Sequence, residues 1–160
     1  MTSAIVVAAH LIELGLDQSK TVTPMKLQKL IYLAHGIHLA RFDSPLINED
    51  IEAWSYGPVI RTIYDAFKSW GNQPIKEIPE FEFRIGGKVF RSHLDLLTED
   101  EMDTIKLAWE IGGDLTGQQL SNWSHSTGSP WEKTYKSGGN KKIKRDIIKD
   151  YFINTMKIEA

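Results

Sequence analysis

Signals for the start of a helix recur along the sequence and constrain the chain to a largely helical fold. Thr23 is followed by Pro24, which combines an N-cap hydroxyl with a proline at the first helical position. At three further sites a hydroxyl stands three residues before a carboxylate or an amide, which is the spacing of a capping box. These are Thr98 with Glu101, Thr116 with Gln119, and Ser129 with Glu132. We therefore expect a helix to begin at each of the four positions.

Apolar residues at helical spacing predict how far these and other helices extend. The pattern indicates helices over residues 3–14, 24–41 and 58–70. The third is expected to begin at Gly57-Pro58, after a short extended piece at residues 51–56. Further helices are predicted over 98–111 and 116–123, from 130 onward, and in the last stretch after residue 139.

One stretch has the alternation of a β-hairpin instead. In FEFRIGGKVFR, residues 81–91, apolar and polar residues alternate on both sides of Gly86-Gly87. The predicted fold class is therefore mainly α. We expect a single compact multi-helix domain over residues 1–160, with one small antiparallel β-hairpin near residues 81–92.

Composition narrows the function classes. The chain has 160 residues and a formal net charge of −2, which gives no basic field for a nucleic-acid backbone, so nucleic acid is an unlikely partner. It has no cysteine, so disulfides and zinc–thiolate sites are excluded and a cytoplasmic location is expected. The apolar run at residues 4–9 is interrupted by His10 and Glu13, which predicts neither a signal peptide nor a membrane span.

Candidate metal and catalytic groups are weakly supported. His35 and His38 are three residues apart, as are His10 and Glu13, but the sequence places no third ligand beside either pair, so no metal and no cofactor are predicted. Ser124 and His125 lack the glycine-rich elbow that would activate the serine, so no catalytic residue is predicted. A basic cluster is interpreted as a solvated helix face: Lys141, Lys142, Lys144 and Arg145.

Aromatic residues at the expected loop–helix junctions carry more information. Trp54 and Tyr56 precede one predicted helix, and Trp123, His125 and Trp131 lie where one predicted helix ends and the next begins. Such residues either plug the core while their N–H or O–H groups find local partners, or anchor a protein interface, where Trp and Tyr dominate the binding energy. Spacing favours the core but leaves both interpretations open.

Three segments together resemble the Panacea antitoxin domain, the family of SocA-like antitoxins and phage-associated GepA-like proteins. They are MKLQKLIYLAHGIHLAR, EDIEAWSYGPVIRTIYDAF and LSNWSHSTGSPWEKTY. The resemblance spans nearly the whole chain and is strongest at the KLQKL run with Tyr32, at Trp54 with Tyr56 to Val59, and at His125 with Pro130-Trp131. Ile37, Ser55 and Ser124 are mild departures from the family pattern.

The resemblance implies a toxin–antitoxin role without catalytic activity, in which the protein neutralises a cognate toxin by direct binding. One branch of the family implies an alternative, in which the protein delivers its toxin to a ClpXP-type protease. We expect partner-binding roles for Lys26, Lys29, Arg61, Tyr64 and Trp131, the two lysines steering an acidic toxin. Residues expected to be structural are Tyr32, Trp54, Tyr56, Gly57, Pro58, His125 and Pro130.

A rival interpretation is a small-ligand or enzymatic pocket around Tyr56 and His125. In it His125 would act as acid or base and Lys26 would bind an anion. This interpretation requires the three side chains to converge on one cavity. DNA binding for autoregulation is a third possibility, and the charge balance argues against it.

Overall fold

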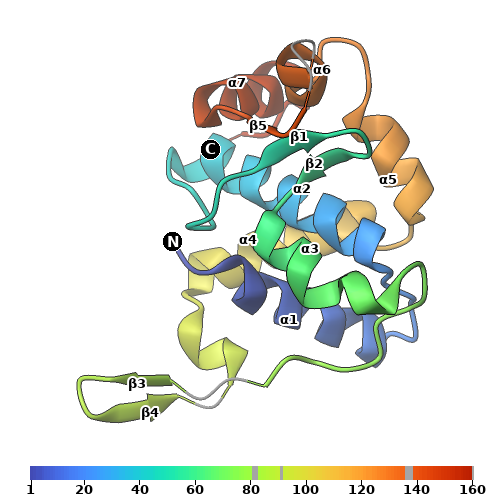
Figure 1. The fold of residues 1–160 in the computed structure, drawn as a ribbon. Helices are drawn as coiled ribbons and strands as arrows, with labels where there is room; N and C mark the ends of the chain where they lie inside the picture. The colour runs from blue at the N-terminus through green and yellow to red at the C-terminus, as the bar shows by residue number, and fades with distance from the viewer. Residues whose placement is uncertain (81–82, 91, 136–138, 160) are drawn as a thin grey trace.

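The longest described helix, α2 (Pro24–Phe42), runs through the middle of a computed structural model that describes residues 1–80, 83–90, 92–135 and 139–159 (Figure 1). Every residue of α2 from Lys26 to Ala40 is buried. A helix buried on all sides needs neighbours on all sides, and α2 contacts helices α1, α3, α4, α5 and α7 as well as strand β2. The mainly α fold class is thus confirmed.

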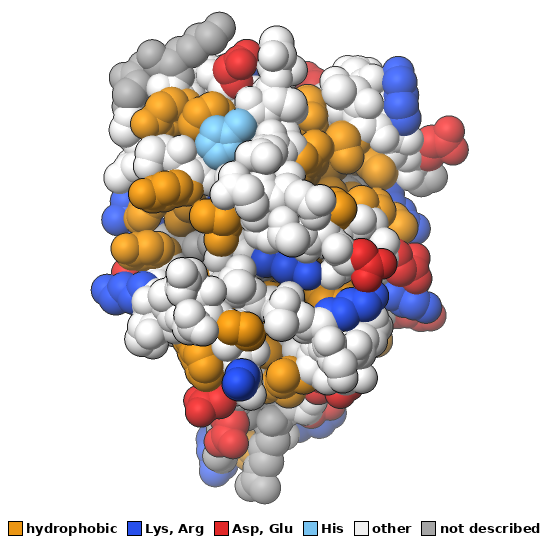
Figure 2. Space-filling view, turned by 90° about the vertical axis from the view of Figure 1, so that its right-hand side faces the viewer, with side chains coloured by type: hydrophobic (Ala, Val, Ile, Leu, Met, Phe, Trp, Pro, Cys, Tyr) orange, Lys and Arg blue, Asp and Glu red, His pale blue; other side chains and the backbone are white. Residues whose placement is uncertain are grey.

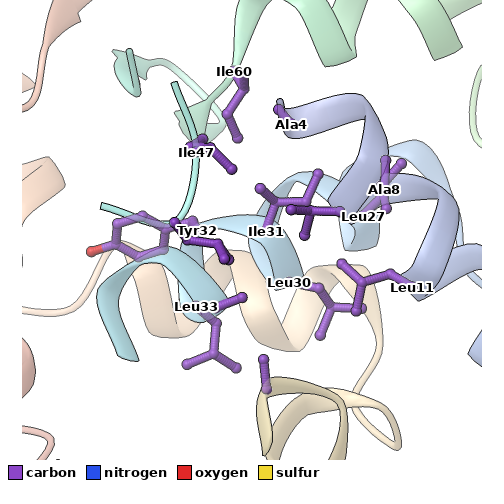
Figure 3. Packing of buried hydrophobic residues seen from close by; sticks show 14 of the residues in the cluster. Ala4, Ala8, Leu11, Leu27, Leu30, Ile31, Tyr32, Leu33, Ile47 and Ile60 are labelled. Atoms are coloured by element: carbon purple, nitrogen blue, oxygen red, sulfur yellow. The ribbon is translucent and has the colours of Figure 1, made fainter. Parts of the chain in front are cut away.

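The other helices are shorter than α2. Their bounds are α1 (Ala4–Asp17), α3 (Arg61–Phe67), α4 (Glu99–Gly112), α5 (Gly117–Ser124), α6 (Pro130–Tyr135) and α7 (Arg145–Asn154), with 3-10 turns η1 (Lys68–Trp70) and η2 (His93–Leu96). The core lies between α2 and these helices (Figure 3). In it, Leu27, Leu30 and Ile31 of α2 meet α1 residues such as Leu11, and all four are fully buried.

The predicted helix starts are confirmed by their hydrogen bonds. The Thr23 hydroxyl accepts from the backbone N–H of Lys26 at 3.3 Å. Thr98 and Thr116 form complete capping boxes with Glu101 and Gln119. The Ser129 hydroxyl accepts from the Glu132 N–H at 3.1 Å.

The predicted hairpin is also present, as β3 (Phe83–Ile85) paired antiparallel with β4 (Lys88–Phe90). Gly86 and Gly87 form its turn with φ of 57° and 79°, a conformation that glycine adopts without strain. The ends of the sequence stretch, at 81–82 and 91, lie outside the described residues.

A second sheet was not predicted. It consists of β1 (Glu52–Trp54), β2 (Gly57–Val59) and β5 (Lys141–Lys142) in the order β2-β1-β5, with both pairs antiparallel. This sheet is additional to the predicted hairpin near residues 81–92, whereas the expected start of a helix at Gly57-Pro58 is wrong. Gly57 and Pro58 belong to β2, an edge strand, where a proline without an N–H is tolerated, and α3 begins only at Arg61.

The basic cluster is likewise not one helix face. Lys141 and Lys142 lie in β5, Lys144 is the N-cap of α7, and Arg145 begins that helix. All four side chains are exposed.

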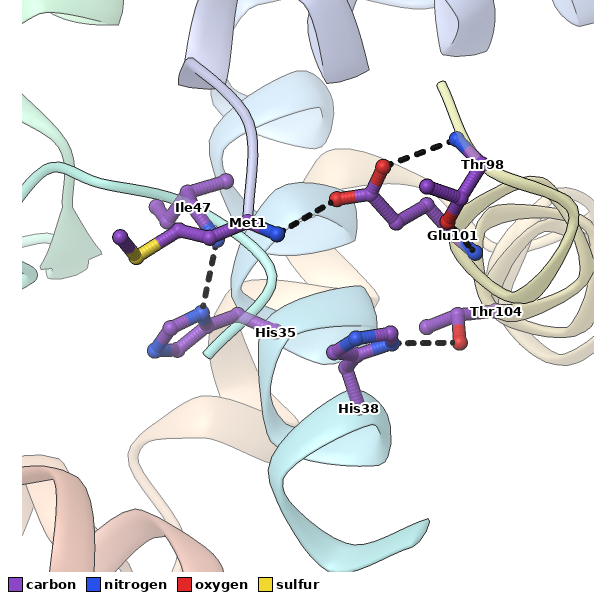
Figure 4. Close-up of polar contacts among 7 residues, drawn as sticks. All are labelled: Met1, His35, His38, Ile47, Thr98, Glu101 and Thr104. Atoms are coloured by element: carbon purple, nitrogen blue, oxygen red, sulfur yellow. Dashed lines mark hydrogen bonds and ion pairs between the residues drawn. The ribbon is translucent and has the colours of Figure 1, made fainter. Parts of the chain in front are cut away.

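The histidines of α2 are held by buried polar contacts (Figure 4). His35 Nδ1 accepts from the Ile47 N–H at 3.4 Å, and burial lowers the His35 pKa to about 3, so this imidazole is neutral. His38 Nδ1 lies 2.8 Å from the Thr104 hydroxyl of α4. The two side chains therefore have separate partners on different elements. Among the described residues, no helix is both long and apolar enough to cross a membrane.

Candidate protein-binding surface

An apolar groove of about 300 Å³ opens where the β1–β2 hairpin, the start of α2 and helix α3 meet. We call it the aromatic groove. The face on the right of Figure 1, seen front-on in Figure 2, carries hydrophobic side chains gathered in several patches. The groove is lined by Pro24, Met25, Gln28, Lys29, Trp54, Tyr56, Val59, Ile63, Tyr64, Lys68 and Gly71.

Two tyrosines of the groove are open to solvent. Tyr56 is 68% exposed and Tyr64 is 46% exposed, which is high for side chains of this size. Trp54 is half-buried, with its ring centroid 5.1 Å from that of Tyr64. The Arg61 guanidinium lies 5.2 Å from the Trp54 ring centroid and donates to Glu52 at 2.9 Å. Tyr56 was expected to have a structural role, and its side chain is exposed to solvent.

The backbone of the hairpin, by contrast, is firmly held. The carbonyls of residues 54, 55 and 56 each face a side chain from the later part of the chain. Trp131 Nε1 donates to Trp54 O at 2.6 Å, His125 Nε2 lies 3.2 Å from Ser55 O, and Ser121 Oγ donates to Tyr56 O at 3.2 Å. The turn that carries Tyr56 is thus fixed by α5 and α6.

The His125 side chain lies between two backbone segments and contacts both of them. Its Nδ1 lies 2.6 Å from Ser121 O, its Nε2 faces Ser55 O, and its ring packs on Trp131 at a centroid distance of 4.1 Å. The neighbouring Ser124 hydroxyl is buried and donates to Ser121 O at 2.7 Å, which gives it a structural role.

Two residues of the KLQKL run in α2 form hydrogen bonds with the end of the same hairpin and the residue that follows it. The Gln28 amide donates to Ile60 O at 3.0 Å and accepts from Ile60 N–H at 2.9 Å. Lys29 Nζ donates to Pro58 O at 3.2 Å. Together these bonds fix the link between β2 and α3. No local pattern in the sequence indicates these contacts of Gln28 and Ser121, because their partners are backbone groups 32 and 65 residues away.

The two lysines expected to steer a toxin are buried, so that expectation is corrected. Lys26 is 6% exposed and Lys29 is 1% exposed, and both bind backbone carbonyls. Lys26 Nζ donates to Gly113 O at 2.6 Å, just past the C-terminus of α4, where the helix dipole favours a cation. Burial lowers the pKa of Lys29 to about 8.

The other residues singled out from the sequence are placed as follows. Tyr32 is fully buried, with its ring centroid 5.6 Å from that of Trp123 and 5.7 Å from that of Phe152. Pro130 is buried at the start of α6. Trp131 is half-buried and stacks on Tyr135 with ring centroids 4.7 Å apart.

The rival ligand pocket does not form. Among the described residues that line the aromatic groove, Tyr56 is present but neither Lys26 nor His125 is. Lys26 lines a different depression, together with Lys20 and Asp114. The three side chains that the pocket interpretation requires are therefore not brought together.

The shifted pKa of Lys29 leads to a prediction about stability. Raising the pH from 7 to 10 should increase the free energy of unfolding of the wild-type protein by about 2 kcal/mol more than it increases that of a Lys29→Met variant. Between the folded pKa of about 8 and the ordinary lysine value of 10.5, the unfolded chain binds more protons than the folded one, so the free energy of unfolding rises with pH. Urea unfolding at several pH values measures this difference.

The control for this experiment is Lys68→Met, since Lys68 is 59% exposed and should leave the pH dependence unchanged. If the free energy of unfolding depended on pH equally in the wild type and in Lys29→Met, the lowered pKa of Lys29 would be contradicted.

Comparison with known proteins adds one family and one relative. The model of the family described as "Antitoxin SocA-like, Panacea domain" matches residues 27–132, which include Gln28, the whole β1–β2 hairpin and Trp131. The protein described as "Antitoxin SocA" from Caulobacter vibrioides (strain NA1000 / CB15N) is 30% identical over 141 residues, covering 82% of this chain and 72% of that protein. No solved structure matches the chain.

Proposed function

Because this chain belongs to the family of SocA-like antitoxins with a Panacea domain, we propose that it is an antitoxin that neutralises a cognate toxin by binding it directly. We place the toxin on the aromatic groove. The observation that carries this placement is the pair of exposed tyrosines, Tyr56 and Tyr64, beside Trp54 on a hairpin whose backbone is held from both sides.

The chemistry of the groove suits a protein partner. A few residues contribute most of the binding energy at protein interfaces, and Trp and Tyr are enriched among them. Because the hairpin carbonyls are already bonded, little further ordering of the backbone is needed when the toxin binds, which lowers the entropic cost of association. A specific interface buries about 1,600 Å² in total, so the groove would be its centre and the surrounding polar surface its rim.

Electrostatic attraction is expected to contribute less to toxin binding than burial of the aromatic side chains. The exposed cations beside the groove have carboxylate neighbours: Arg61 pairs with Glu52 at 2.9 Å, and Lys68 lies 3.6 Å from Asp65. With these pairs and a net charge of −2, the protein offers no strong field for an acidic toxin. We therefore expect toxin binding to depend only weakly on salt concentration.

The test begins with the gene next to this one. Its product should be toxic when expressed alone, harmless when this protein is co-expressed, and should co-purify with it in a fixed stoichiometry. A harmless neighbouring product, or one that does not co-purify, would remove the main support for the proposal. Inhibition of the purified toxin without any protease would favour blocking, whereas rescue that requires a ClpXP-type protease would favour delivery to proteolysis.

A further inference from the structure

We propose that His10, Glu13 and His93 form a binding site for a divalent transition-metal ion, with zinc the expected occupant. The site lies where η2 packs on α1, and none of its three residues lines the aromatic groove. Histidine imidazoles and one carboxylate are a common three-ligand set for zinc, with a fourth position left for water or another ligand.

Three ligand atoms converge at this point. His93 Nε2 lies 3.4 Å from Glu13 Oε1, and His10 Nδ1 lies 3.8 Å from the same oxygen. All three atoms lie within 4.8 Å of one another. Ligands about 2.0–2.1 Å from a tetrahedral zinc ion are about 3.3 Å apart, so only small side-chain movements are needed to close the site.

The two imidazole nitrogens are buried and have no hydrogen-bond partner among the described residues. A buried nitrogen without a partner loses its hydration without compensation, which costs about 1–3 kcal/mol. His93 is 6% exposed, so its Nε2 is directed into the cluster and away from solvent. A metal ion would satisfy both nitrogens at once.

A metal ion binds the neutral form of each imidazole through the lone pair of its coordinating nitrogen. The imidazole rings of His10 and His93 are tilted by 43° with centroids 5.5 Å apart, so they are not stacked face to face. Glu13 is 30% exposed and gives the ion a path from solvent.

The sequence alone pointed away from this site. His10 and Glu13 lie one turn apart on α1, and sequence spacing places no third ligand beside this pair. The fold supplies the third ligand from η2, which follows the β3–β4 hairpin. A bound ion would therefore join the segment after that hairpin to the first helix.

The test is zinc binding to the full-length, tag-free, metal-stripped protein by isothermal titration calorimetry. We expect one zinc ion per chain, and at free zinc 100 times Kd a rise in melting temperature of about 5–10 °C. Glu13→Gln removes the ligand charge at constant shape and should weaken zinc binding at least tenfold, as should His93→Gln. The matched control Glu110→Gln, an exposed glutamate of α4, should bind zinc like the wild type.

If His93→Gln does not fold, the absorption spectrum of Co²⁺ in the wild type and in Glu13→Gln decides the question. The wild type should show the intense visible bands of four-coordinate cobalt, and Glu13→Gln should not. Failure of the wild type to bind zinc, or equal zinc affinity in the wild type and Glu13→Gln, would overturn the site. Toxin binding enters none of these measurements, so the site and the proposed function can fail independently.

Discussion

Replacing Tyr56 and Tyr64 together by alanine is expected to weaken toxin binding at least about 100-fold, or roughly 3 kcal/mol. Both rings are exposed in the free protein and would be buried by the partner, so their loss removes interface contacts. The loss should appear mainly as faster dissociation. Calorimetry or surface-based kinetics with the purified toxin measures it, and circular dichroism checks that the variant is folded.

Two control variants test whether the loss of affinity comes from removing these aromatic rings. The phenylalanine versions of both positions keep the rings and should retain most of the affinity. Leu16→Ala, at a 41% exposed residue of α1 that is not part of the groove lining, should bind the toxin normally. Wild-type affinity in the double alanine variant would place the toxin on another surface.

Gly36→Ala is expected to destabilise the protein by about 3 kcal/mol or more, the upper range for overpacking a core. A Cβ at Gly36 would lie only 2.3 Å from two ring atoms of Phe152. That ring contacts Tyr32, Trp123 and Tyr151 at centroid distances of 5.7, 6.1 and 5.8 Å, so moving it away from the new methyl group would disturb this packing. In an open helix the same change would be stabilising by about 1 kcal/mol.

A second substitution tests the cause of that loss. Phe152→Leu is destabilising by itself because it leaves space in the core, but it removes the atoms that the new methyl group would meet. We therefore expect Gly36→Ala with Phe152→Leu to be more stable than the sum of the two separate losses predicts. Chemical denaturation of all four proteins gives the coupling energy, and strict additivity would contradict the proposed clash.

Local signals in the sequence predicted the helices well, because a cap hydroxyl and the N–H that it binds are only three residues apart. The start of α3 was misplaced for a related reason. Apolar residues at Val59, Ile60 and Ile63 continue the helical spacing backward into β2, so periodicity alone cannot locate the boundary. Strand β5 is two residues long, and its partner β1 lies about ninety residues earlier, so no local pattern indicated it.

The candidate sites depended even more on distant contacts. Charge at Lys26 and Lys29 suggested an exposed surface, but both side chains are buried in the fold and donate to the backbone carbonyls of residues 113 and 58. Tyr56 stood among apparent structural residues, and only the folded hairpin shows that its carbonyl, and not its ring, is held. His93 is separated from His10 by more than eighty residues, a distance over which sequence spacing carries no information about metal ligands.

The bonds to the hairpin carbonyls also set an order of events during synthesis. Ser121, His125 and Trp131, which hold residues 54–56, are translated some seventy residues after the turn that they fix. At about 5–20 residues per second, a ribosome needs several seconds to reach them, and the tunnel delays their release further. Until then the aromatic groove lacks the hydrogen bonds that hold the β1–β2 turn, so under the proposed function a nascent chain should be unable to bind toxin before residues 121–131 have been synthesised and released.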